Sequence, residues 1–426
     1  MSGLLASCTK IWLTDMVYAF TDEDKELLGA VSGRDPLGIL PVWQYRARDV
    51  VPHLTAASRE LSGFHVLLVA LAWWPEFATQ HSQPVRDLEK YFLLVEQAFA
   101  RACNTQDGQW PLPGTRRLGA GGTGVWIGLA PSQHLLGGQL PNGTWGIYRS
   151  AAISAGFMDD KNNVNAELAA KIKESTGCMK LVMPFVKEAM GKGDGEVWIA
   201  KQRNHRLVGD LSKIIKKYPL ANLLCKPLLN PSVPQVTAQV VALMRLQRNK
   251  DDFECQAFVL NAMTNIPDYQ EVFQHILHCE HYLATVEAVF EWLCSGESSS
   301  VKKAAQRLPV IMDVDALKAA KRDFLQSGDY GLNTLAAKRK TMMESLDLSN
   351  NESFLSTLIQ QHGEVSAARN NDPWISILET GRFDVRVSTG KPADTQLDPA
   401  TSWRNGYYLP SLFNLVKQFH EGGRRK

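Results

Sequence analysis

Basic side chains that could contact phosphates gather in the middle third of this 426-residue chain. Residues 111–250 hold 19 basic and 8 acidic residues, a net charge of +11, whereas residues 1–110 and 251–426 carry −4 and −5. Phosphate contacts need mobile cations on one surface, and their affinity falls as salt rises. The cations predicted to contact nucleic acid are Lys201, Arg203, Arg206, Lys213, Lys216 and Lys217.

Two elements would have to position these cations. The segment Glu196–Ala200, between a Gly-rich turn and polar residues, predicts a strand. Beyond it, Asp210 is expected to cap a helix that Pro219 ends. The buried stripe of this helix would consist of Leu211, Ile214, Ile215 and Tyr218. The alternative interpretation is a solvated or protein-contacting helix whose lysines complement its C-terminal dipole.

A second set of chemically capable residues is Glu271, His275 and His278. On a helix these residues share one face, because positions three and four apart are neighbours. With a fourth ligand from elsewhere they could hold a metal ion for hydrolysis. The sequence contains no His-Glu-x-x-His string, and a solvated or interface face is the favoured interpretation. We therefore predict no metal, no cofactor and no catalytic residue, with a metal-dependent hydrolase of dispersed residues as the alternative.

Two strings match known motifs without the surroundings that those motifs need. Gly119–Gly124 matches G-x-G-x-x-G, which binds a pyrophosphate only between a strand and a helix N-terminus. Prolines precede it and apolar residues follow, so a flexible loop is favoured. Asp313–Asp315 is like the nucleophile strand of haloacid-dehalogenase-type phosphatases, but too few residues separate it from the acidic Asp329. Helix capping by Asp313 or Asp315 is favoured instead.

Hydrophobic periodicity predicts a mainly α, helical multi-domain protein. A nearly apolar helix is expected over 55–74, with Pro75 closing it, and an amphipathic helix over 88–99. Two short helices, 132–140 and 144–157, predict a winged-helix-like unit in the middle, although three-helix bundles have a similar pattern.

Residues 234–369 are expected to be helical, and the secondary structure is expected to change after them. Trp374–Leu378 and Phe383–Val387 predict a small C-terminal β-hairpin, followed by a last helix over 407–420. The expected domains are an N-terminal helical domain, a Gly/Pro-rich loop or linker, a basic middle domain, a helical domain, and a C-terminal hairpin and helix, over residues 1–104, 105–124, 125–232, 233–371 and 372–426 in that order.

Composition indicates a globular protein of a reducing compartment. The chain is 45% hydrophobic, and its 7 cysteines include no Cys-x-x-Cys pair, so free thiols are expected. The apolar stretch Leu4–Phe20 lacks the basic leader of a secretion signal. The strongest apolar run, Phe64–Trp74, is far shorter than the roughly 20 residues that span a bilayer. We expect a cytoplasmic protein with no membrane contact.

Two stretches carry a resemblance to known proteins. One is Ser132–Phe157, with Gly137-Gly138-Gln139-Leu140 and Gly143-Thr144-Trp145-Gly146-Ile147-Tyr148; the other combines Asp372-Pro373-Trp374-Ile375 with Trp403-Arg404-Asn405-Gly406-Tyr407-Tyr408. Together they are similar to uncharacterised bacterial proteins encoded near helicases and nucleases in phage-defence islands. The resemblance covers about a fifth of the chain. It implies a defence-system subunit and assigns no catalytic residue.

The function expected from these observations is that of a non-enzymatic subunit of a bacterial DNA-targeting or anti-phage defence complex. Its basic middle would contact nucleic acid, with DNA favoured over RNA. Its acidic terminal segments would contact protein partners such as a helicase or nuclease. A pure protein–protein scaffold is the second alternative, and it predicts neither metal nor nucleic-acid binding.

Overall fold

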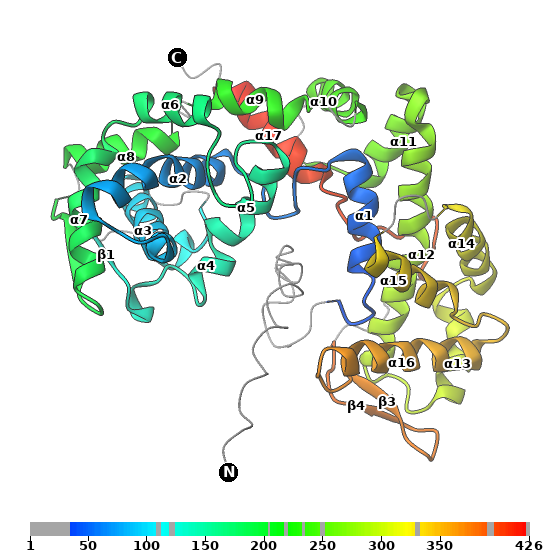
Figure 1. Ribbon diagram of the computed structural model, residues 1–426. Helices are drawn as coiled ribbons and strands as arrows, with labels where there is room; N and C mark the ends of the chain where they lie inside the picture. Colours follow the sequence, from blue (N-terminus) through cyan, green and yellow to red (C-terminus); the bar gives the residue numbers. More distant parts are fainter. Residues whose placement is uncertain are drawn as a thin grey trace, which may run out of the picture. The chain divides into compact units, whose positions relative to one another are not determined.

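The computed structural model describes residues 35–107, 112–118, 124–202, 205–216, 220–231, 235–247, 252–328, 333–389 and 396–422. Within these ranges the chain is mainly α-helical, and its strands form two antiparallel pairs (Figure 1). The predicted mainly α class is therefore confirmed. The chain divides into two compact units, and each unit combines segments that are far apart in the sequence.

Unit 1 comprises the described residues of Pro52–Asn249 and Pro410–Lys426, and unit 2 those of Asp24–Val51 and Lys250–Leu409. The five predicted domains remain a prediction. The predicted linker 105–124 lies inside unit 1, and the predicted boundary at 233 lies shortly before the junction of the units at 249 and 250.

The elements of unit 1 are mostly short helices around two long ones. They are α2 (Leu61–His81), α3 (Leu88–Asp107), β1 (Val125–Gly128), α4 (Gln139–Asn142), α5 (Thr144–Ser154), α6 (Ala166–Ser175), α7 (Met179–Gly191), β2 (Glu196–Ala200), α8 (Arg206–Lys216), α9 (Ala221–Leu229), α10 (Val236–Gln247) and α17 (Leu409–Gly422).

Helix α2 is the central helix of unit 1 and contacts α3, α5, α6, α7 and α8. Its apolar residues are buried from Leu61 to Trp73. Length and composition would let α2 cross a membrane, but 78% of its most apolar window is buried inside the protein. That burial is what the core helix of a soluble protein shows.

The bounds predicted for this helix were wrong at both ends. The hydroxyls of Thr55 and Ser58 bond to each other's backbone N–H groups, at 3.2 and 2.7 Å, and hold a turn, so the helix begins only at Leu61. It also continues through Pro75, which lies on the exposed side. Phe77 beyond it is buried against Tyr91, with ring centroids 4.7 Å apart. This packing compensates for the hydrogen bond that proline removes.

Of two other helices predicted for unit 1, one is confirmed and one is reduced to short pieces. The amphipathic helix over 88–99 is confirmed as part of α3. The helix expected over 132–140 is reduced to a 3-10 turn, Pro131–Gln133, and the four residues of α4. Gly138 separates them with a φ of 64°, a conformation that helices do not contain. The winged-helix unit is therefore not confirmed.

The elements of unit 2 are helices and one hairpin. They are α1 (Leu40–Val50), α11 (Cys255–Asn265), α12 (Gln270–Cys294), α13 (Val301–Ile311), α14 (Val314–Gln326), α15 (Thr334–Glu344), α16 (Asn351–Ala368), β3 (Ile375–Ile377) and β4 (Phe383–Val385). Antiparallel pairing of Ile375 with Val385 confirms the predicted C-terminal hairpin.

Helix α12 carries a fully buried carboxylate, Glu280, at the centre of unit 2. Its oxygens accept hydrogen bonds from the backbone N–H of Arg404, from the backbone and side-chain N–H groups of Asn405 at 2.7 and 3.0 Å, and from the Tyr407 hydroxyl at 2.8 Å. Tyr407 and Tyr408 have φ values of 48° and 59°, which bulky residues rarely adopt. The four bonds to Glu280 thus hold a strained segment against α12.

We expect Glu280→Ala to lower the free energy of unfolding of the full chain by roughly 3 kcal/mol, because it leaves buried donors without an acceptor. Glu280→Gln should also destabilise, since an amide puts a donor where one carboxylate oxygen accepts. Urea unfolding followed by circular dichroism measures both changes. Glu271→Ala, at an exposed position of the same helix, is the matched control, and equal stability of the Glu280 and Glu271 variants would contradict the expectation.

Candidate functional site

The two-stranded sheet of unit 1 is held in place by one side of α3. The Gln97 amide donates to the Gly128 carbonyl at 2.9 Å and accepts from the Gly128 N–H at 3.1 Å, as a neighbouring strand would. One helical turn later, Arg101 donates to the Gln133 carbonyl at 2.6 Å. The Arg101 guanidinium lies 3.6 Å from the centroid of the Trp126 ring in β1. Core residues of α3 thus fix the sheet that carries this tryptophan.

The sheet has a buried face and an outer face that carries two tryptophans. Trp126 of β1 is the register partner of Trp198 of β2. Val197 and Ile199, the neighbours of Trp198 in the strand, are buried, whereas Trp198 is 41% exposed. The alternation is that of a strand with one face on the core. The strand predicted over Glu196–Ala200 is confirmed.

The structure describes part of the predicted set of cations. Lys201 directly follows β2 and is exposed. Arg206 and Lys213 lie on α8 and both pair with Asp210, at 3.8 and 3.4 Å. Lys216 is the last residue of α8, and its side chain lies outside the described part of the structure, as do Arg203 and Lys217.

Asp210 does not cap this helix, contrary to prediction. Helix α8 begins at Arg206, and the Leu207 N–H bonds to Nδ1 of His205 at 3.2 Å. Asp210 lies one turn further on, between Arg206 and Lys213. The predicted burial of Leu211, Ile214 and Ile215 is correct, while Tyr218 lies outside the described residues.

Sequence reasoning did not single out Arg101 or Trp126. Arg101 lies in a helix that precedes the basic segment, and in the sequence 125–127 is only a short apolar run after the glycine string. A strand, not a helix, follows Gly124, so the dinucleotide-binding arrangement is missing on that side. A cross-strand partner for Trp198 was the signal that could have been sought.

The predicted metal candidates lie on α12 as expected, but they do not form a metal site in the described structure. Nε2 of His275 lies 3.7 Å from Oε1 of Glu271. No group of three histidine, cysteine, aspartate or glutamate side chains converges anywhere within the described ranges. The capping interpretation of Asp313 is confirmed, because its carboxylate accepts from the N–H groups of Asp315 and Ala316 at 2.9 and 3.1 Å.

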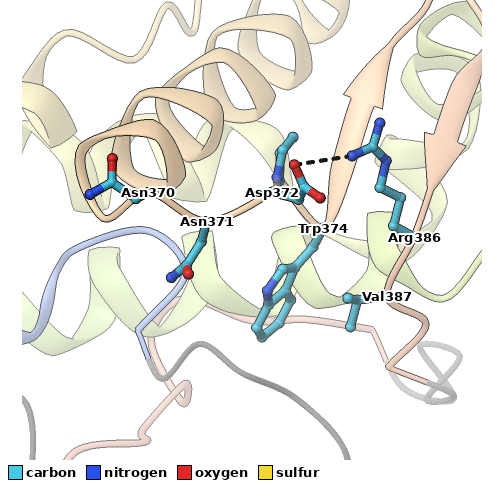
Figure 2. A pocket seen from close by; sticks show the side chains of 7 residues that line it. Asn370, Asn371, Asp372, Trp374, Arg386 and Val387 are labelled. Carbon is cyan, nitrogen blue, oxygen red and sulfur yellow. Dashed lines mark ion pairs between the residues drawn. The ribbon is translucent and has the colours of Figure 1, made fainter.

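A polar pocket of about 380 Å³ opens in unit 2 where α16 ends and the hairpin begins (Figure 2). Asn370 has a φ of 56° and closes α16 in the left-handed manner typical of helix ends. Arg386 faces Asp372, as the dashed line in Figure 2 marks, at 3.5 Å, and Asp384 at 3.1 Å. Because two carboxylates flank this one guanidinium, the pocket is not an anion site.

Trp374, which lines this pocket, is held by His362 of α16. Nδ1 of His362 bonds to the Pro36 carbonyl at 2.8 Å, and its Nε2 accepts from the Trp374 N–H at 2.7 Å. The imidazole is therefore neutral, with its proton on Nδ1. Burial is the main cause that lowers the pKa of His362. These bonds attach the strand that follows Trp374 to α16.

The six cysteines of the described residues are free, as predicted.

Comparison of the chain with protein-family models finds no match, and comparisons with curated proteins and with solved structures likewise find none.

The His362 bonds predict a specific dependence of stability on pH. The folded-state pKa is lower than the unfolded-state value of about 6.5. The stabilisation by neutral His362 is therefore complete above about pH 6.5 and is lost as pH falls through the folded-state pKa. His362→Ala should lower the free energy of unfolding by about 2 kcal/mol at pH 8, and by progressively less below pH 6. Urea unfolding at several pH values measures the difference, and a constant difference would contradict it.

Proposed function

We propose that unit 1 binds nucleic acid through a basic segment made of Lys201, Arg206 and Lys213. The observation that carries the proposal is that all three side chains are exposed, with Lys201 directly after a strand that exposes a tryptophan and the other two on α8, the next helix along the chain. The opposite side of α8 is buried through Leu211, Ile214 and Ile215, so the helix presents its cations outward. Cations with an aromatic neighbour are a common composition of nucleic-acid surfaces.

The one acidic residue of this helix does not cancel the cations. Arg206 and Lys213 pair with Asp210, yet their side chains are 91% and 64% exposed. Exposed ion pairs of this kind contribute about 0–1 kcal/mol. A phosphate of a nucleic acid can therefore replace the Asp210 carboxylate as the partner of either cation. The counterions that the nucleic acid releases on binding favour this exchange.

We further propose that the chain is a non-enzymatic subunit of a bacterial DNA-targeting or anti-phage complex in the cytoplasm. The proposal is supported by the charge of the chain, which is +11 over 111–250 and −5 over 251–426. Acidic segments repel nucleic acid, so they are the part of the chain left to contact a protein partner, such as a helicase or nuclease. DNA is favoured over RNA as the ligand.

A variant with Lys201→Ala, Arg206→Ala and Lys213→Ala tests this proposal. Binding of a labelled DNA oligonucleotide by the full chain is followed by fluorescence anisotropy at several salt concentrations. The wild type should lose affinity steeply with salt, and the slope of log K against log salt should fall by about one for each phosphate contact removed.

The matched control removes the same charge from exposed lysines elsewhere in unit 1, with Lys90→Ala, Lys161→Ala and Lys226→Ala. If both triple variants lose affinity equally, net charge and not the basic segment governs binding. If the wild type binds neither DNA nor RNA but co-purifies with protein partners, the scaffold alternative replaces the proposal.

A further inference from the structure

The outer face of the β1–β2 sheet holds two indole rings at neighbouring positions. Trp126 and Trp198 are register partners in antiparallel strands, so their side chains project from the same face. The inner face is apolar and closed, with Val125, Ile127 and Val197 buried. An isolated exposed apolar residue is ordinary on a protein surface. A cross-strand aromatic pair supported by a closed core face is a more specific arrangement.

Both rings are held in fixed positions. The Arg101 guanidinium lies over Trp126 at 3.6 Å and is itself anchored to the Gln133 carbonyl. The Trp198 ring lies against the backbone of Gly124, because a Cβ at that position would meet ring atom Cζ3 at 2.6 Å. Side chains that are ordered before binding lose little conformational freedom when a ligand arrives. The face is therefore preorganised.

Basic residues flank this aromatic pair along the chain, and one of them, Lys192, also pairs with Glu188 at 3.0 Å. The Arg101 guanidinium lies over the Trp126 ring, and Lys201 follows the last residue of β2. Nζ of Lys192, on the turn before β2, lies 3.5 Å from the Glu196 carbonyl oxygen. Glu196, exposed at the start of the strand, is the opposing carboxylate. Flat π-surfaces bordered by cations suit a ligand that is both flat and anionic.

Resting on the proposed function, we infer that this face is a base-stacking platform and that the nucleic acid bound there is single-stranded. In a duplex the faces of the bases are covered by their neighbours, and only base edges and phosphates are accessible. An unpaired base can stack on Trp198, while Lys201 and Arg206 contact the backbone of the same strand. Stacking accepts every base, so the platform is expected to have little sequence preference.

The carboxylate of Glu196 should also affect how tightly the platform binds a single strand. Glu196 lies near Arg101, and its charge supports the protonated guanidinium against the effect of burial, which lowers the pKa of Arg101. A strand on the platform would bring its phosphates towards this carboxylate. Glu196→Gln should therefore raise affinity for single-stranded oligonucleotides several-fold, because one repulsive charge is removed.

The test compares a labelled 20-nucleotide oligo-dT with a 20-base-pair duplex, by fluorescence anisotropy of the full chain at several salt concentrations. The wild type should bind the single strand more tightly. Trp198→Ala should weaken single-strand binding by about tenfold to a hundredfold, with an unchanged salt slope and unchanged duplex binding. Trp198→Phe, which keeps a ring, should restore most of the affinity. Leu181→Ala, at an exposed apolar residue of α7, is the control and should bind as the wild type does.

The outcomes separate the two proposals. Single-strand binding by Trp198→Ala at wild-type strength, or equal loss for both oligonucleotides, overturns the platform. In that case the proposed function still stands if the basic-segment variant reduces the salt slope. Binding of neither oligonucleotide by the wild type overturns both. Circular dichroism of each variant shows whether it is folded, and the retention of binding by Trp198→Phe guards against a loss that arises from misfolding.

Discussion

A carboxylate that is buried in a helical unit has to be surrounded by hydrogen-bond donors. Each unit of this protein is organised around one such buried carboxylate. In unit 1, Glu96 of α3 is 1% exposed and accepts from the Gln139 amide at 2.6 Å and from the Thr144 N–H at 2.5 Å. Thr144 is the first residue of α5, so the negative charge lies at a helix N-terminus, where it is favoured. In unit 2, the buried carboxylate of Glu280 accepts hydrogen bonds from Arg404, Asn405 and Tyr407 of a loop. Satisfying these two charges fixes where α5 and the Trp403–Tyr408 segment lie.

The same principle connects the core to the aromatic face. Gln97 follows Glu96 in α3 and is fully buried, and its amide supplies both hydrogen bonds that the edge of β1 would otherwise lack. Arg101, four residues later, reaches the outer side of the sheet. A helix whose middle turn is buried therefore determines the position of Trp126 at the surface. Binding residues on rigid elements of this kind retain their geometry.

Features set by local periodicity could be predicted from the sequence. The helical class, the amphipathic stretch of α3, the strand at Glu196–Ala200 and the hairpin near Trp374 depend on residue alternation and turn composition. Helix capping by Asp313 or Asp315 was predicted because aspartate is a preferred residue just before an amphipathic helix. The bounds of α2 were not predictable, because packing of Phe77 on Tyr91 outweighs the local penalty of Pro75. Nor was the start of α8, where His205 takes the place expected for Asp210.

The sequence by itself determined the kind of surface to seek: cations concentrated over 111–250, next to the predicted strand Glu196–Ala200. Only the tertiary structure decided which residues join them. Arg101 precedes the basic segment, and Trp126 lies more than seventy residues before Trp198, so no local pattern links the three. Antiparallel pairing of β1 with β2 brings the two indoles together, and buried hydrogen bonds from Gln97 hold β1 against α3. Such contacts depend on the closure of the whole core, which periodicity does not encode.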